Sequence, residues 1–97
     1  MPETEGLSPR PVAVVTGAGS GVGRAVVQRL AAAGWRVALV GRHESSLRET
    51  IAAAGAHAEA LCEPFVCDVT DPAAVATMAS GVLARFGQVD ALVNSAG

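Results

Sequence analysis

Short runs of hydrophobic residues alternate along the chain with stretches in which hydrophobic residues recur at helical spacing. Residues 12–16 and 36–40 are apolar except for Thr16 and Arg36 and contain several β-branched side chains, which predicts strands covered on both faces. Residues 89–93 predict a fourth strand. The third strand is less distinct, because Glu59, Glu63 and Pro64 interrupt its pattern; we place it at residues 64–67, with irregular or edge structure before it.

Three helices are predicted between these strands, at residues 22–33, 44–54 and 72–86. Glycines that can close a helix stand at Gly34, Gly55 and Gly87, and Asp71 followed by Pro72 is typical of a helix start. The expected buried positions are Val22, Val26, Leu30 and Ala33 in the first helix, Leu47, Ile51 and Ala54 in the second, and Val75, Met78, Val82 and Phe86 in the third.

Alternation of strands and helices with short connections predicts right-handed crossovers onto one parallel sheet. The expected fold class is α/β, a partial doubly wound, Rossmann-like sheet with the strand order 3-2-1-4. In this order the chain changes direction across the sheet between the first and fourth strands. Ligands of such folds bind beyond the carboxyl ends of the strands at that point.

Composition and charge exclude several classes of function. The 97 residues are 51% hydrophobic and suit one small domain or part of a larger one. A net charge of −2 provides no basic field for nucleic acid, and no apolar stretch approaches the ~20 residues of a membrane span. We therefore expect neither nucleic acid nor a membrane as a partner. Residues 1–10 contain no targeting signal and are expected to form a flexible tail.

The cysteines and histidines are expected to be structural or solvated. Cys62 and Cys67 lack paired spacing, and in an extended segment their separation of five points the side chains to opposite faces, so we expect buried free thiols. This usage fits a reducing compartment, and a cytoplasmic location is expected. His43 and His57 show no partner spacing, so we expect solvated loop histidines and no metal site.

The densest motif is a glycine-rich loop between the first strand and the first helix. Such a loop presents unsatisfied backbone N–H groups and the positive end of a helix dipole to an anion. A Walker phosphate loop requires lysine, and the chain has none. The G-x-G-x-x-G pattern fails because Val22 or Arg24 occupies its sixth position, whereas T-G-x-x-x-G-x-G fits. The candidate phosphate-binding residues are Thr16, Gly17, Gly19, Ser20, Gly21, Val22 and Gly23.

The loop from Thr16 to Gly23 resembles the cofactor loop of the short-chain dehydrogenase/reductase family. Residues 67–71, Cys-Asp-Val-Thr-Asp, are similar to the family's D-V segment, where the Asp and the next residue line the adenine pocket. Residues 94–97, Asn-Ser-Ala-Gly, resemble its N-N-A-G motif, with Ser95 in place of the second Asn. The resemblance covers nearly the whole chain and implies further cofactor contacts from Asp68, Val69, Asn94, Ala96 and Gly97.

Two of these residues have simpler structural interpretations. Asp68 fits a solvated or capping carboxylate near a helix start. Asn94 fits an amide that ties adjacent strand ends together, and this role is compatible with bordering the cofactor. Both interpretations remain open at the level of sequence.

The end of the second strand bears on the choice of cofactor. Gly41 stands where dinucleotide folds place an acid that holds the ribose hydroxyls, and Arg42 offers a guanidinium fork to an additional 2′-phosphate. The pair favours NADP over NAD. The alternatives are that Arg42 is a solvated cation, and that Glu44 reaches the ribose if the loop is shifted by two residues.

The resemblance implies hydride transfer between a nicotinamide and an alcohol or carbonyl substrate, with a catalytic tyrosine, lysine and serine that follow the fourth strand. This chain contains no tyrosine and no lysine, and we assign no catalytic residue. We interpret residues 11–97 as the partial dinucleotide-binding Rossmann domain of a larger oxidoreductase, expected to form a homo-oligomer. The alternatives are a non-catalytic dinucleotide-binding module or pseudoenzyme, and a flavodoxin-like mononucleotide binder.

Overall fold

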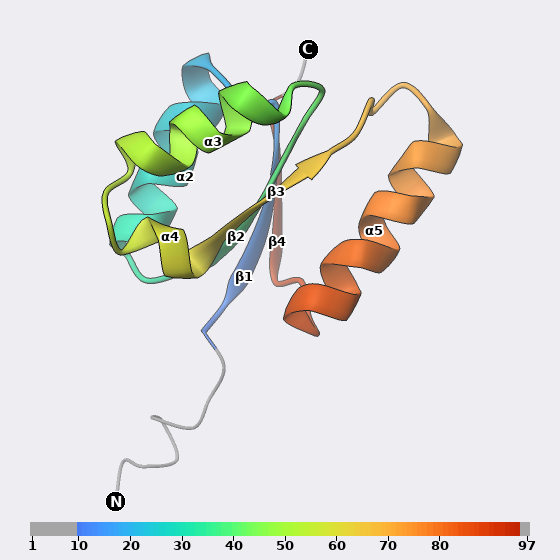
Figure 1. The fold of residues 1–97 in the computed structure, drawn as a ribbon. Helices are drawn as coiled ribbons and strands as arrows, with labels where there is room; N and C mark the ends of the chain where they lie inside the picture. Colours follow the sequence, from blue (N-terminus) through green and yellow to red (C-terminus); the bar gives the residue numbers. More distant parts are fainter. Residues whose placement is uncertain (1–9, 96–97) are drawn as a thin grey trace, which may run out of the picture.

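The computed structural model describes residues 10–95, which form a four-stranded sheet with helices on both faces (Figure 1). The strands are β1 (Val12–Thr16), β2 (Arg36–Gly41), β3 (Cys62–Val66) and β4 (Ala91–Asn94). The helices are α2 (Gly21–Ala32), α3 (Glu44–Ala53), α4 (Ala58–Leu61) and α5 (Pro72–Phe86). In Figure 1, α2, α3 and α4 lie on one side of the sheet and α5 lies on the other.

The sheet is parallel, with the order β3-β2-β1-β4. This confirms the predicted α/β class and strand order. Within the sheet, Val15 of β1 pairs with Leu39 of β2 and with Val93 of β4. Because parallel strands end at the same edge, the loops that follow the strands come together there, as ligand sites of doubly wound sheets require.

Each face of the sheet has its own hydrophobic core. Val15 and Leu39 pack with Leu47 of α3 on one face, and Val40 packs with Val82 and Phe86 of α5 on the other. All five residues of β1 are buried, which confirms a strand covered on both faces. Helices α3 and α5 therefore bury four of the predicted positions, Leu47, Ile51, Val82 and Phe86. Val75, Met78 and Ala54 are only partly buried, and Ala54 lies just beyond α3.

The two cysteines are free and lie in opposite cores, as their separation predicted. Cys62 belongs to the core beneath α2 and α3, and Cys67 belongs to the core beneath α5. Burial, with a smaller contribution from Glu59, raises the pKa of Cys62 to about 11. Burial also raises the pKa of Cys67. Both thiols therefore stay protonated at neutral pH, which makes them poor nucleophiles.

The predicted third strand was placed too late in the chain. It spans Cys62–Val66 rather than 64–67, and the short helix α4 precedes it. Pro64 lies inside the strand, opposite Leu39 in the pairing register. A proline is tolerated there because β3 forms an edge of the sheet, where one row of backbone groups needs no ladder hydrogen bond.

The predicted buried face of α2 was also wrong in part. Val22 is 71% exposed, and Ala33 lies beyond the last helical residue. Val26 and Leu30 are only partly buried against the core. Two of the three residues that the helix buries are small, which allows a close approach to its neighbours. The buried residues of α2 are Gly23, Val27 and Ala31.

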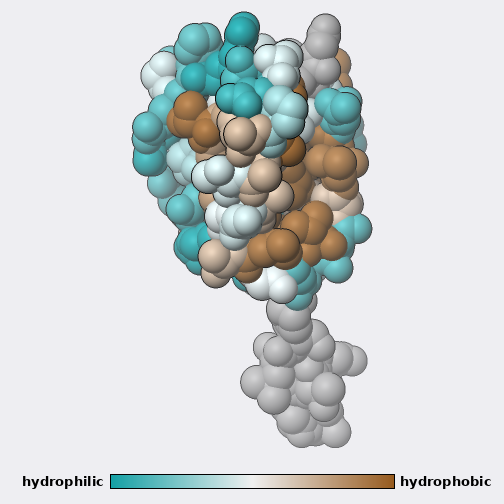
Figure 2. Space-filling model, turned by 90° about the vertical axis from the view of Figure 1, so that its right-hand side faces the viewer, coloured by the Kyte–Doolittle hydropathy of each residue, from teal (hydrophilic) through white to brown (hydrophobic). Residues whose placement is uncertain are grey.

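Strand β4 forms the other edge of the described sheet and begins at Ala91, two residues later than predicted. Leu92 on this strand is 66% exposed, and Leu83 of α5 is 53% exposed. Figure 2, viewed toward the α5 side, shows hydrophobic residues gathered along one border of this face. Exposed hydrophobic side chains therefore lie both on β4 and on α5. No helix within residues 10–95 has the length and apolar character needed to cross a membrane.

Helix α5 begins at the predicted cap. Oδ1 of Asp71 accepts hydrogen bonds from the backbone N–H groups of Ala73 (3.0 Å) and Ala74 (3.4 Å). Asp71→Ala is expected to lower the free energy of unfolding by about 1 kcal/mol, because both amides lose their acceptor. Urea unfolding measures this change. Asp71→Asn keeps an acceptor and should stay within about 0.5 kcal/mol of the parent; equal losses in the two variants would contradict the capping role.

Candidate functional site

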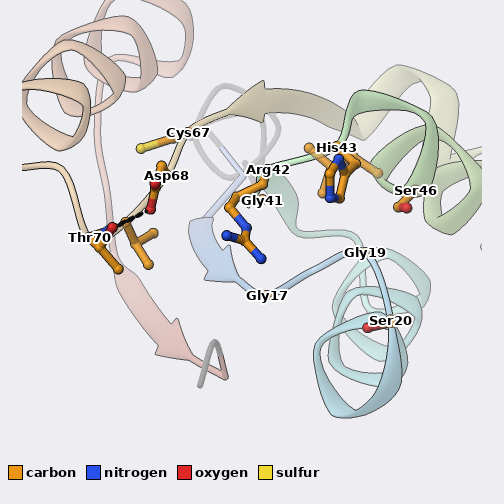
Figure 3. Close-up of a pocket in the computed structure, with 12 residues that line it drawn as sticks. Gly17, Gly19, Ser20, Gly41, Arg42, His43, Ser46, Cys67, Asp68 and Thr70 are labelled. Atoms are coloured by element: carbon orange, nitrogen blue, oxygen red, sulfur yellow. Dashed lines mark hydrogen bonds between the residues drawn. The ribbon is translucent and has the colours of Figure 1, made fainter.

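A cavity of about 600 Å³ lies at the carboxyl edge of the sheet, beyond β1, β2 and β3. Its walls are the glycine-rich loop, the residues that follow β2 and β3, and the first turn of α3 (Figure 3). Among the site residues predicted from the sequence, those that line it are Gly17, Gly19, Ser20, Gly41, Arg42, Asp68 and Val69. Five further residues line the cavity and were not predicted as site residues from the sequence: His43, Ser46, Leu47, Cys67 and Thr70.

The glycine-rich loop needs its glycines for two different reasons. Gly17 and Gly21 have φ of +64° and +57°, a region that favours glycine. A Cβ on Gly23 would lie 2.1 Å from the carbonyl oxygen of Gly17 and 2.7 Å from Oγ of Ser95. The first turn of α2 is therefore packed directly against the backbone of the loop, which leaves no room for a side chain at residue 23.

The amino terminus of α2 is open to an anion. Its N-cap residue, Ser20, makes no side-chain capping hydrogen bond, and the first turn holds no acidic residue. Helix α5 differs, because the side chain of Asp71 accepts hydrogen bonds from N–H groups of its first turn. Within residues 10–95, the first-turn N–H groups of α2 thus lack a side-chain cap, while the helix dipole places positive potential on them.

A cation and an anion face the cavity from β2 and β3. The side chain of Arg42 extends into the space between Gly17 and Asp68 (Figure 3). Oδ1 of Asp68 accepts hydrogen bonds from Oγ1 (2.6 Å) and the backbone N–H (2.9 Å) of Thr70. These bonds, and to a smaller extent the charge of Arg42, lower the pKa of Asp68. Asp68 therefore presents an ionised acceptor and caps a local turn, whereas Asp71 caps the helix.

The ends of β1 and β4 are joined by side chains beside the loop. The hydroxyl of Thr16 donates to Oδ1 of Asn94 (2.8 Å) and accepts from the backbone N–H of Ser95 (3.2 Å). Oγ of Ser95 also donates to the carbonyl of Thr16. Asn94 thus ties strand ends together, as its structural interpretation held, and its exposed position next to the loop remains compatible with a cofactor. Ala96 and Gly97 lie outside the described residues.

Several predicted residues stand beside the cavity rather than in its wall. Thr16 and Asn94 belong to the joined strand ends, and Gly21, Val22 and Gly23 form the first turn of α2. His43 is exposed, as predicted, yet it lines the cavity as the N-cap residue of α3. Its position directly after Arg42 in the sequence is the signal that could have identified His43 as a lining residue.

The alternative that Glu44 serves a ribose gains no support from the geometry. Its Oε2 accepts a hydrogen bond from Nε of Arg48 at 2.7 Å, across one turn of α3. Glu44 does not line the cavity, whereas Gly41 and Arg42 both do.

Comparison with known proteins identifies the family. The sequence model of the short chain dehydrogenase family matches residues 11–97. The chain is 43% identical over 94 residues to the short-chain reductase protein NovJ of Streptomyces niveus, which covers 94% of this chain and 34% of that protein. This chain therefore belongs to the short-chain dehydrogenase family. It spans about a third of the length of the curated relatives that it matches.

Solved structures agree in fold and differ in their cofactors. A metagenomic short-chain oxidoreductase in complex with NADP is 42% identical, with a TM-score of 0.80 over 90% of this chain and 39% of that one. A 3-ketoacyl-(acyl-carrier-protein) reductase from Brucella melitensis, complexed with NADH, is 30% identical, with a TM-score of 0.76 over 87% of this chain and 33% of that one. The choice between the two dinucleotides must therefore come from the residues of this chain.

Proposed function

We propose that this chain is the NADP(H)-binding part of an oxidoreductase that transfers a hydride between a nicotinamide and an alcohol or carbonyl substrate. The observation that carries the proposal is the first turn of α2, whose N–H groups have no side-chain cap. Gly23 in this turn packs against the backbone of Gly17. The turn lies beside the cavity that Arg42 also lines. Amides at a helix start and a guanidinium fork suit two separate phosphate groups. NADP carries both a pyrophosphate and a 2′-phosphate.

Each part of the cofactor has a candidate partner in the chain. The loop amides would hold the pyrophosphate, Arg42 would hold the 2′-phosphate beside the space left by Gly41, and Asp68 with Val69 would border the adenine. When bound, the nicotinamide would donate the hydride to a carbonyl substrate or accept it from an alcohol. The residues that we propose to contact the cofactor or support its loop are Thr16, Gly17, Gly19, Ser20, Gly21, Val22, Gly23, Gly41, Arg42, Asp68, Val69, Asn94, Ala96 and Gly97.

The fit of the site supports a dinucleotide rather than a smaller ligand. A Cβ at Gly19 would approach Cβ of Ser46 to 2.9 Å, and one at Gly23 would meet the loop backbone, so the loop is built without side chains at both points. At these two points the loop offers a ligand only its backbone N–H groups. The cavity extends from this loop to Arg42 and Asp68, which gives the pyrophosphate, ribose and adenine regions separate contacts.

NADPH is expected to bind the purified chain about tenfold more tightly than NADH, because one charge-assisted contact to the 2′-phosphate distinguishes them. FMN, which lacks a pyrophosphate, is expected to bind more weakly than either. Isothermal titration calorimetry of the three ligands measures these affinities. Equal affinities for NADPH and NADH would contradict the role of Arg42, and preferential binding of FMN would replace the proposal with a mononucleotide site.

A further inference from the structure

Two side chains that do not line the cavity hold the backbone of the glycine-rich loop. Nη2 of Arg24 in α2 donates to the carbonyl of Gly19 (2.7 Å), and its Nε donates to Oγ1 of Thr50 in α3 (2.9 Å). Thr50 is fully buried, and its hydroxyl donates to the carbonyl of Ala18 (2.7 Å). Two successive carbonyls of the loop are therefore fixed by neighbouring helices.

Fixing these carbonyls also fixes the amides that follow them. In a planar trans peptide, the C=O and the N–H of one unit point in opposite directions, and residues 10–95 contain no cis peptide. The bond to Ala18 thus orients the N–H of Gly19, and the bond to Gly19 orients the N–H of Ser20. Both Gly19 and Ser20 line the cavity.

We propose that Arg24 and Thr50 are positioning residues for pyrophosphate binding, an inference that rests on the function proposed above. They set the direction of the Gly19 and Ser20 amides before a ligand arrives. Donors that are already oriented bind an anion without the entropy cost of ordering a mobile loop. The network therefore acts on affinity for the pyrophosphate through the loop backbone.

The geometry requires the fork of Arg24 rather than its charge alone. Its planar guanidinium bonds a carbonyl and a hydroxyl in different directions, which a lysine ammonium on a flexible stem reproduces poorly. Nη2 also lies 3.4 Å from the carbonyl of Ser46 in the same helix as Thr50. The carboxylate of Glu49 is 3.6 Å away, but its side chain is 70% exposed, so this ion pair contributes little.

Arg24→Ala is expected to weaken NADPH binding about tenfold and to leave binding of adenosine 2′-monophosphate unchanged. The second ligand carries adenine, ribose and a 2′-phosphate but no pyrophosphate, so it does not use the loop amides. Titrations followed by NMR give both dissociation constants. Arg29→Ala is the matched control, because it removes the same charge from an exposed position on α2 and should affect neither ligand. Arg42→Ala should weaken both ligands.

Thr50→Val, a near isostere without the hydroxyl, is expected to reproduce the selective loss of NADPH affinity, and Arg24→Lys should restore little of it. These two variants decide the question if Arg24→Ala does not fold. Equal weakening of both ligands would show a merely structural role, and unchanged NADPH affinity would show no role; either result overturns the inference. If the parent chain binds neither ligand, the proposed function fails instead.

Discussion

Gly23→Ala is expected to reduce the affinity for NADPH by about 100-fold or more and to lower the free energy of unfolding by about 2–3 kcal/mol. The new methyl group would stand 2.1 Å from the carbonyl oxygen of Gly17 and 2.7 Å from Oγ of Ser95. The first of these atoms belongs to the backbone of a turn held at positive φ, so it cannot move aside without changing the loop. Calorimetry with NADPH and urea unfolding measure the two effects.

Gly81→Ala provides the matched control for this substitution. Gly81 lies inside α5, and a Cβ there would meet the ring of Phe65 at 3.4 Å, which is ordinary contact. Alanine should therefore stabilise the chain by about 0.5–1 kcal/mol through helix propensity, with unchanged NADPH affinity. If Gly23→Ala behaved like Gly81→Ala, the close packing of α2 on the loop would have no role in binding.

The sequence predicts the strands of this fold well because buried parallel strands have a simple pattern. Residues 12–15 are apolar and, with Thr16, form β1 at the predicted positions. The pattern is weaker in β3, where one side of the strand is open and polar residues such as Glu63 occur within it. Pairing with β2 determines where β3 begins, and this is a tertiary interaction that local residue types do not encode.

The buried face of α2 shows a second limit of sequence patterns. The spacing of large hydrophobic residues predicts that Val22 is buried. In the structure Gly23 is buried against the loop and Val22 faces solvent. Small residues carry no hydrophobic signal, although they determine how closely a helix approaches its neighbours. A rotation of one residue along the helix is enough to exchange these positions.

The candidate site follows from the sequence only where it lies on the strand-end loops. Glycine spacing locates the loop, and parallel strands bring it to the same edge as Arg42 and Asp68. The contacts from Arg24 to Thr50 join residues that are 26 positions apart, and they depend on how α2 packs against α3. No motif spacing reports such a contact, so the sequence alone assigns Arg24 no role in the site.

Gly41→Asp combined with Arg42→Ala is expected to reverse the cofactor preference, with NADPH affinity falling about 10- to 100-fold and NADH affinity rising. The substitution removes the guanidinium that would hold the 2′-phosphate. It also adds a carboxylate that accepts hydrogen bonds from ribose hydroxyls and repels the additional phosphate. Calorimetric titration of both dinucleotides gives the ratio of affinities, and an unchanged ratio would contradict the assignment of Gly41 and Arg42.

Single variants separate the contributions to this reversal. A Cβ at Gly41 would lie 3.0 Å from Cδ2 of the buried Leu47, so Gly41→Ala measures the cost of that tight contact alone, and it should affect both dinucleotides alike. Arg42→Ala should weaken NADPH binding selectively. The low pKa of Asp68 arises first from its hydrogen bonds with Thr70, and Arg42 is its smallest cause. Asp68 therefore stays ionised at neutral pH without Arg42, so the loss of affinity reports the 2′-phosphate contact rather than a change at the adenine end.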